Sequence, residues 1–403
     1  MNKSKLFTAA EKTAQWMINN QITNREDANR GRVFKYYDFK TEFSGLTHNW
    51  MTGALCMSLL AIYKRTKDKK YLRHAEYAGR YIISLQVMDQ RDEKYYGVIR
   101  EITPQSIEFA PRDATTAAWV LVWLYEATKN PLYLDRAILF GNWHLKFAMH
   151  DGWPLYAKYM DPDLEDFYAK GSFQSGTGLF YHDLFMMSGD TRYIEFGLKP
   201  IADNYIKDFF EENGQLILER DLFTNKKKSV PSEQKDVIKN KMHLFNDDFG
   251  GAMLQSASDL FKEEKYRHQA KKYAYWLADN QNEDGSFLDG TVYSGVPVSL
   301  MYFNDLGEYY KDDKLLKARD KALKQLLSMQ ISGTNNTKLK GAFQGDYAGP
   351  DKTGGKINMN TRSTSYALMA LLKLESKTKN IWLGRYNTKW IDPLKRGIHN
   401  LVW

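Results

Sequence analysis

The sequence of 403 residues has one cysteine, Cys56, so no intramolecular disulfide can form. Cys56 stands in an apolar helical pattern, which favours a small core residue over a nucleophile. The chain also lacks a run of about 18 apolar residues, the length that a membrane-spanning helix needs. Its start, MNKSKLFTAAEKTAQW, has no apolar segment of the length found in a secretory signal. We therefore expect a cytoplasmic protein without a membrane partner.

Motifs of metal, nucleotide and nucleic-acid sites are missing as well. HExxH, GxGxxG and P-loop patterns do not occur, and neither do zinc-finger spacings, an RNP-like segment or a long basic stripe. The net charge of +8 is modest for this length. The sequence thus predicts no nucleic-acid partner, no cofactor and no metal. A basic surface does suit an anionic small molecule or glycan, which it attracts by electrostatic steering.

The chain repeats a pattern of an apolar helical run, a short turn and a second, more amphipathic helix. The repeated turns are TKDKKYL (66–72), TKNPLYL (128–134), SGDTRYI (188–194), FKEEKYR (261–267), YKDDKLL (310–316) and a weaker TKNIWLG (378–384). Several second helices end alike, in SLQ, DNQ or SMQ, and the N-terminal segment FTAAEKTAQWMINNQ ends in NNQ. The first helix therefore looks like the outer partner of the last apolar run. Six inner and six outer helices then close into a ring, which removes exposed ends.

One of the outer helices is followed by QNEDGSF (281–287). Asn and Asp-Gly are typical of helix ends and turns, so we expect Asp284 to serve a turn rather than a catalytic acidic patch. Six helical hairpins with such turn sequences between them resemble the six-hairpin glycosidase superfamily. The resemblance covers nearly the whole chain and implies an all-α fold, an (α/α)6 barrel, with residues 1–403 in a single domain. Terpene cyclases, N-acylglucosamine 2-epimerases, lanthionine cyclases and several polysaccharide lyases share such toroids, so the fold alone does not give the function.

The long connections should all lie on the face of the ring where the inner helices begin. Long ordered loops usually carry function, and the helix N-termini would direct positive dipole ends into one funnel that suits an anion. These connections are rich in aromatic residues that stack on sugars or else pack the loops onto the barrel. The aromatic residues that we expect to bind substrate are Tyr37, Trp153, Tyr156 and Tyr347. Whether the polar segment 225–240 is a lid stays open.

The starts of the inner helices supply the catalytic candidates. APRDATTAAW places Arg112 and Asp113 at one start, where Asp113 is either an N-cap or a catalytic acid. FNDDFGG places Asp247 and Asp248 at another start, and two adjacent carboxylates exceed what one cap needs. If one of them lies near Asp113 across the ring, repulsion would raise one pKa and leave a general acid beside a base. A Ca²⁺ or Mg²⁺ ion on this pair is the one metal alternative.

Other inner-helix starts supply candidate substrate contacts. GLTHNWMTGA contains His48 and Trp50, and His48 is a cap, a packing residue, a substrate contact or a proton carrier. Arg362, in NMNTRSTSYA, is placed to hold a substrate carboxylate through a two-pronged bond or to anchor a loop. Gln174, in KGSFQSGTG, stands among small residues that let a ligand approach.

Paired carboxylates suffice for glycoside hydrolysis, since one protonates the leaving oxygen while the other activates water or attacks. The resemblance narrows this to hydrolases of uronic-acid-containing oligosaccharides, such as unsaturated glucuronyl and rhamnogalacturonyl hydrolases. These use Asp at inner-helix starts, and Asp113 looks most similar to that position. We expect Asp113 as the acid, Asp247 or Asp248 as its partner, and an anionic oligosaccharide as substrate. The oligomeric state stays open.

Four alternatives remain at this point. A uronate lyase would use Arg362 to neutralise the substrate and a base such as His48, and the sequence does not separate it from a hydrolase. A sugar epimerase would need several histidines in the funnel, whereas the whole chain has eight. A terpene cyclase rests on a faint DLED at 163–166 and conflicts with the charged funnel. A non-catalytic glycan-binding toroid would retain the aromatic residues and use the three aspartates as caps.

Overall fold

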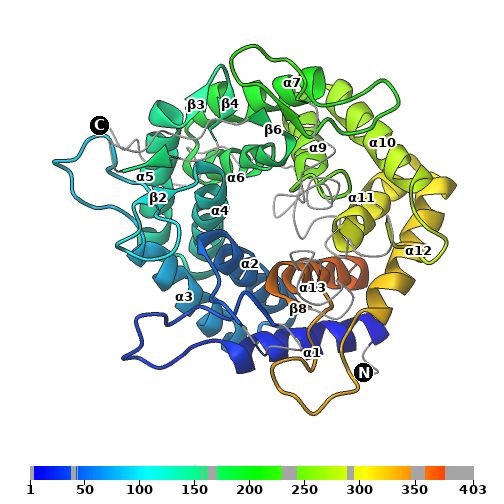
Figure 1. Cartoon of the computed structure of the whole chain (residues 1–403), viewed down its shortest axis with the longest axis horizontal. Coiled ribbons are helices and arrows are strands. Elements are labelled where there is room, and N and C mark those ends of the chain that lie inside the picture. The colour runs from blue at the N-terminus through cyan, green and yellow to red at the C-terminus, as the bar shows by residue number, and fades with distance from the viewer. Residues whose placement is uncertain are drawn as a thin grey trace.

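Two concentric rings of helices make up the protein (Figure 1). The structure is a computed structural model that describes residues 4–37, 42, 44–155, 158–160, 170–228, 243–287, 295–345 and 359–376. The inner ring consists of α2 (Asn49–Thr66), α4 (Pro111–Thr128), α6 (Thr177–Ser188), α9 (Gly250–Phe261), α11 (Gly295–Tyr310) and α13 (Thr361–Ser376). The outer ring consists of α1 (Lys5–Asn20), α3 (Lys69–Ser84), α5 (Pro131–Phe147), α7 (Lys199–Asp208), α10 (Glu264–Asp279) and α12 (Asp313–Ser328). The prediction of an (α/α)6 barrel is confirmed.

The two rings differ in how much of each helix is buried. In α2 every residue from Met51 to Ile62 is buried, because its neighbours in the ring surround it. The outer helix α3 instead buries Tyr71, Ala75, Ala78 and Ile82, at three- and four-residue spacing. None of the helices in the described ranges is both long enough and apolar enough to cross a lipid bilayer.

The first two repeated turns join an inner helix to its outer partner in the same conformation. Lys67 and Lys129 follow α2 and α4 with φ near 60°, a left-handed conformation that ends a helix. Asp68 and Asn130 come next, and each side chain accepts a hydrogen bond from a backbone N–H in the first turn of the outer helix. The sequence repeat therefore encodes a C-cap followed directly by an N-cap.

The ends of the described chain meet and close the ring. Helix α1 packs against α13 as its outer partner and also contacts α2. Thr13 on α1 donates its hydroxyl proton to the carbonyl of Gly341, at 2.8 Å. The side chain of Gln330, just after α12, donates to the carbonyl of Ala9 at 2.9 Å. The predicted pairing of the first helix with the last apolar run is thus confirmed.

The connections between hairpins contain short structures that the sequence analysis did not anticipate. Four antiparallel ladders are formed by β1 (Tyr36–Tyr37) with β8 (Met359–Asn360), β2 (Glu108–Phe109) with β5 (Lys158–Tyr159), β3 (Met149–His150) with β4 (Trp153–Pro154), and β6 (Lys170–Gly171) with β7 (Glu219–Arg220). A 3-10 helix, η1 (Ser172–Gln174), precedes α6, and a π-helical turn, η2 (Tyr193–Leu198), precedes α7. Pro200 lacks the N–H that would continue α-helical bonding into η2.

Candidate functional site

Arg112 joins two carboxylates that come from different hairpins. Its Nη1 lies 2.7 Å from Oδ1 of Asp113, the next residue on α4. Its Nη2 forms an ion pair with Oδ2 of Asp248, which lies just before α9. Its Nε donates to the carbonyl of Phe173 at 3.3 Å. Although burial lowers the pKa of Arg112, Asp248 and Asp113 raise it by more, so the guanidinium stays charged between them.

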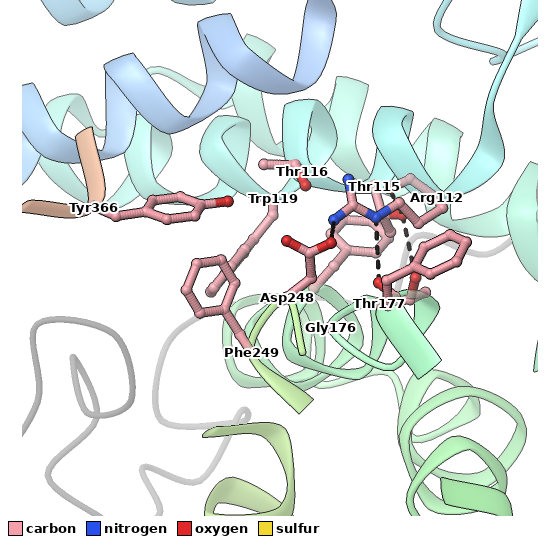
Figure 2. A pocket seen from close by; sticks show the side chains of 11 residues that line it. Arg112, Thr115, Thr116, Trp119, Gly176, Thr177, Asp248, Phe249 and Tyr366 are labelled. Carbon is pink, nitrogen blue, oxygen red and sulfur yellow. Dashed lines mark hydrogen bonds and ion pairs between the residues drawn. The ribbon is translucent and has the colours of Figure 1, made fainter. Parts of the chain in front are cut away.

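A small pocket opens beside this ion-pair centre (Figure 2). Its lining includes Arg112, Asp248, Phe249, Tyr366 and the threonines Thr115, Thr116 and Thr177. Asp248 is 4% exposed, and its Oδ1 has no hydrogen-bond partner among the residues that the structure describes. A buried oxygen without a donor is costly, so a ligand that offers a hydroxyl group there would satisfy it.

The backbone at Asp248 is strained, and Asp247 holds it in place. Asp248 and Phe249 have φ of 47° and 76°, which side-chain-bearing residues rarely adopt and which functional sites often retain. The Asp247 carboxylate accepts hydrogen bonds from the N–H groups of Phe249 at 3.2 Å and Gly251 at 2.6 Å. It also accepts the hydroxyl protons of Tyr302 at 2.6 Å and Tyr205 at 3.2 Å.

Asp247 therefore supports the site without facing it. It is fully buried, and burial raises its pKa to about 6 even though its four donors favour the charged form. The two adjacent aspartates turn to opposite partners, Asp247 into the core and Asp248 to Arg112. Among the described ranges, no three Asp, Glu, His or Cys side chains lie together as a metal site would need.

Glu101 is a buried carboxyl at the site that the sequence analysis missed. It is 6% exposed and is hydrogen-bonded to Asp113, to the N–H of Ala110 and, at 3.3 Å, to Nδ2 of Asn49. Burial raises the pKa of Glu101 to about 7. No periodicity or motif marks Glu101, since it lies in an irregular connection and reaches Asp113 only through tertiary packing.

Asp113 is the carboxyl that combines a raised pKa with access to solvent. Burial and then repulsion from Glu101 raise its pKa to about 7, against the opposing effect of Arg112. Its side chain is 20% exposed. Asp113 is the third residue of α4, whose N-cap is Ala110, so its carboxylate does not have the N-cap role that was the alternative.

His48 lies on the other side of Glu101, with its Nδ1 3.4 Å from Oε1 of that residue. Its Nε2 lies 3.4 Å from Nζ of Lys35. Burial and then Lys35 lower the pKa of His48 to about 4, so the ring is neutral at pH 7. It occupies the N-cap position of α2 but makes no capping hydrogen bond. Its side chain is 26% exposed.

Trp50 links two arginines from opposite ends of the chain. The guanidinium carbon of Arg112 lies 5.6 Å from the centre of the Trp50 ring, and that of Arg362 lies 5.8 Å from it. Both contacts are within the range of cation–π attraction. Arg362 is 7% exposed and stands at the start of α13. The structure thus brings Trp50, Arg112, Arg362, Asp113 and Asp248 together as predicted site residues.

His243 is a second residue that the sequence analysis missed. Its ring lies 5.4 Å from that of Phe173, and its Nδ1 lies 3.4 Å from the carbonyl of Asn246. Burial lowers the pKa of His243, Asp248 opposes that effect, and Arg362 and Arg112 lower the pKa further. The histidine therefore stands close to the charged centre. The sequence signal that could have identified His243 is its position four residues before Asp247, in HLFND.

Three predicted substrate contacts are enclosed by protein instead. Trp153 is 1% exposed and stacks on Phe209, with ring centres 4.6 Å apart. Gln174 is fully buried, accepts the N–H of Gly171 at 2.6 Å and donates to the carbonyl of Pro154. Tyr37 is 3% exposed in β1. For Trp153 and Tyr37 this is the alternative stated for the aromatic residues, which pack their loops onto the barrel.

Two predicted contacts, Tyr156 and Tyr347, lie outside the described residues. The segment 225–240 is described only as far as residue 228. Asn225 within it donates to the Asp208 carboxylate at 3.0 Å and accepts from Lys170 at 2.8 Å, which ties the start of the segment to the outer ring.

Comparisons with known proteins show the fold. No family model matches the chain, and no curated protein is similar in sequence. Cellobiose 2-epimerase from Bacillus thermoamylovorans matches 92% of this chain and 100% of its own, with a TM-score of 0.69 and 13% identity. The unsaturated glucuronyl hydrolase of Bacillus sp. GL1 matches 93% of this chain and 98% of its own, with a TM-score of 0.68 and 13% identity.

A glycoside hydrolase family 76 mannosidase from Bacteroides thetaiotaomicron gives a TM-score of 0.65 over 92% of this chain and 98% of its own, at 13% identity. These likenesses show that the chain has the six-hairpin, (α/α)6 toroid fold. At such identities they show the fold alone, since epimerases and hydrolases share it.

Proposed function

We propose that the protein is a glycoside hydrolase that acts on uronic-acid-containing oligosaccharides, with Asp113 as the general acid. The observation that carries this proposal is the pair Asp113 and Asp248 on one guanidinium, that of Arg112, which lines a pocket together with Asp248. A pKa of about 7 leaves Asp113 with a proton to donate near neutral pH. We propose Asp248, which forms an ion pair with Arg112, as the base.

An unsaturated uronic acid fits these two groups. Asp113 protonates the C4–C5 double bond, and the ring oxygen shares the positive charge that forms at C5. Water then adds at C5 and loses a proton to Asp248. The resulting hemiketal opens and releases the neighbouring sugar. This sequence of steps requires one carboxyl that holds a proton and a second that accepts one.

The anionic part of the substrate is assigned to the arginines. We propose that Arg362, whose guanidinium carbon lies 5.8 Å from the centre of the Trp50 ring, is the cation that binds the uronate carboxylate. The fold neighbour from Bacillus sp. GL1 is itself named as an unsaturated glucuronyl hydrolase. A cytoplasmic location, where imported disaccharides are degraded, belongs to the same proposal.

The first test is the ultraviolet absorbance of the conjugated double bond, followed with unsaturated and saturated uronate oligosaccharides. Hydrolysis of the unsaturated substrate lowers the absorbance. Asp113→Asn keeps the shape but has no proton to donate, so we expect kcat to fall by roughly 10²–10⁴-fold. Glu108→Gln, which changes an exposed carboxylate nearby, is the matched control and should retain activity. Wild-type turnover by Asp113→Asn would falsify the proposal.

A uronate lyase is the second candidate, and one observation favours it. His48 is neutral at pH 7 and partly exposed, as a base that abstracts a proton must be. A lyase creates the conjugated double bond, so absorbance would rise with a saturated substrate. His48→Gln separates the two functions, since it should abolish lyase turnover and leave Asp113-dependent hydrolysis largely in place.

A further inference from the structure

Glu101 is held so that its carboxylate cannot turn away from Asp113. The backbone carbonyl of Glu101 accepts the N–H of Asn49 at 3.0 Å, and its own N–H donates to the carbonyl of Glu108 at 3.3 Å. Its Oε2 is 3.3 Å from Nδ2 of Asn49, and its Oε1 is 3.4 Å from Nδ1 of His48. The connection before α4 and the start of α2 therefore both fix its position.

We propose that Glu101 is a positioning residue whose buried carboxylate shares one proton with Asp113 and thereby keeps Asp113 a proton donor at neutral pH. The inference rests on the proposed function, in which Asp113 supplies that proton. Two carboxyls in hydrogen-bond contact cannot both ionise at low cost, so the pair retains a proton that an isolated carboxyl would lose.

Among the charges around the pair, Glu101 does most to raise the pKa of Asp113. On the pocket side the pair faces Arg112 and Asp248, and Arg112 favours the ionised form of Asp113. On the other side it faces Glu108 and His48, and His48 in turn faces Lys35, Arg32 and Glu108. His48 is neutral at pH 7 and brings no compensating charge. After burial itself, Glu101 is the largest influence that raises the pKa of Asp113.

The test is a carboxyl ¹³C NMR titration of the full chain with labelled Asp and Glu. In the wild type we expect the pair to keep one proton up to about pH 7. In Glu101→Gln, which keeps the shape and removes the charge, the titration of Asp113 should move down by at least about one pH unit, a tenfold change in proton affinity. Glu108→Gln is the control, because Glu108 is an exposed neighbour and should shift Asp113 far less.

A reciprocal variant protects the test from a folding defect in Glu101→Gln. In Asp113→Asn, Glu101 has no ionisable partner at this contact, so the two coupled steps of the pair should become a single titration. Titrations of Asp113 and Glu101 that stay unchanged in these variants would overturn the inference. So would an equal shift of Asp113 in Glu108→Gln.

Kinetics supply a second readout that distinguishes the two proposals. In Glu101→Gln the alkaline limb of kcat/KM should move to lower pH, with activity best preserved near pH 5. A purely structural role would lower activity at every pH without moving the limb. If the wild type degrades no uronate but the titrations shift as expected, the proposed function fails and the shared proton stands. If uronate is degraded and the titrations do not shift, the reverse holds.

Discussion

At the scale of single residues, two adjacent aspartates have opposite tasks. Asp247 is enclosed by Tyr302, Tyr205 and two backbone N–H groups, whereas Asp248 has one oxygen on Arg112 and the other without a partner in the described structure. A carboxylate that accepts four hydrogen bonds stabilises the fold, because removal of the carboxylate leaves each of its donors buried and unpaired. In the proposed function, Asp248 is needed for the reaction instead.

We therefore predict that Asp247→Ala and Asp248→Ala have contrasting effects. Asp247→Ala should lower the free energy of unfolding by roughly 3–5 kcal/mol, as the loss of a buried hydrogen-bond network does. Asp248→Ala should lower it by less, because Oδ1 of Asp248 has no donor to lose in the described structure and Arg112 keeps its ion pair with Asp113, while kcat falls by at least about 10²-fold. Denaturant unfolding and steady-state kinetics measure both. Equal stability losses in the two variants would remove the distinction.

Residue types in the sequence predicted which side chains lie near one another at this candidate site. They did not predict the contacts that depend on tertiary packing. Asp113, Asp248, Arg112 and Arg362 were found because helix starts in a toroid converge on one funnel. The division of labour between Asp247 and Asp248 depends on tyrosines from other helices, which no local pattern encodes. Trp153 was taken for a sugar contact because the sequence does not show whether an aromatic side chain lies on the surface of a loop or beneath it.

At the scale of elements, the repeated glutamines join neighbouring outer helices. Gln86 follows α3, and its side-chain nitrogen donates at 3.0 Å both to the carbonyl of Gly97 in the next turn and to that of Arg136 on α5. Gln281 makes the same pair of bonds to Gly285 and Ala318, each at 3.2 Å. Gln21 and Gln330 repeat the arrangement with α3 and α1.

The turns that contain these glycines require close approach between backbones. At Gly285 φ is 89°, and a Cβ would lie 2.2 Å from the carbonyl oxygen of Lys321. Asp284 accepts the N–H of Ser286 at 2.9 Å, which confirms that it serves the turn. The turn was therefore predicted correctly from the sequence. The hydrogen bonds to the next outer helix could not be predicted, since they join residues that are far apart in the chain, such as Gln281 and Ala318, which are 37 positions apart.

We predict that Gln86→Ala lowers the free energy of unfolding by about 1–3 kcal/mol, because the buried carbonyl of Gly97 and the partly buried carbonyl of Arg136 each lose a donor. Gln90→Ala, on the same connection but exposed, should change it by less than about 0.5 kcal/mol. Urea unfolding followed by circular dichroism measures both variants. The interpretation is wrong if the two variants unfold at the same urea concentration.

At the scale of the whole molecule, closure of the ring depends on helix α1. It buries Phe7, Ala10, Ala14, Trp16 and Met17. Its contact with α13 and the hydrogen bond between Thr13 and Gly341 each join segments more than 300 residues apart. Without α1 the outer surface of α13 would face water, and the start of α13, which carries Arg362, would lose its support.

A chain that lacks residues 1–20 should therefore lose both stability and activity. Burial of Phe7, Trp16 and Met17 contributes about 1.5–3 kcal/mol each, so we expect the free energy of unfolding to fall by at least about 5 kcal/mol. A synthetic peptide of residues 1–20, added in trans, should restore the thermal midpoint in a concentration-dependent way, because it binds only the folded ring. A peptide with Trp16→Ala and Met17→Ala is the matched control and should restore less. An unchanged thermal midpoint in the truncated chain would mean that the other helices hold the ring closed without α1.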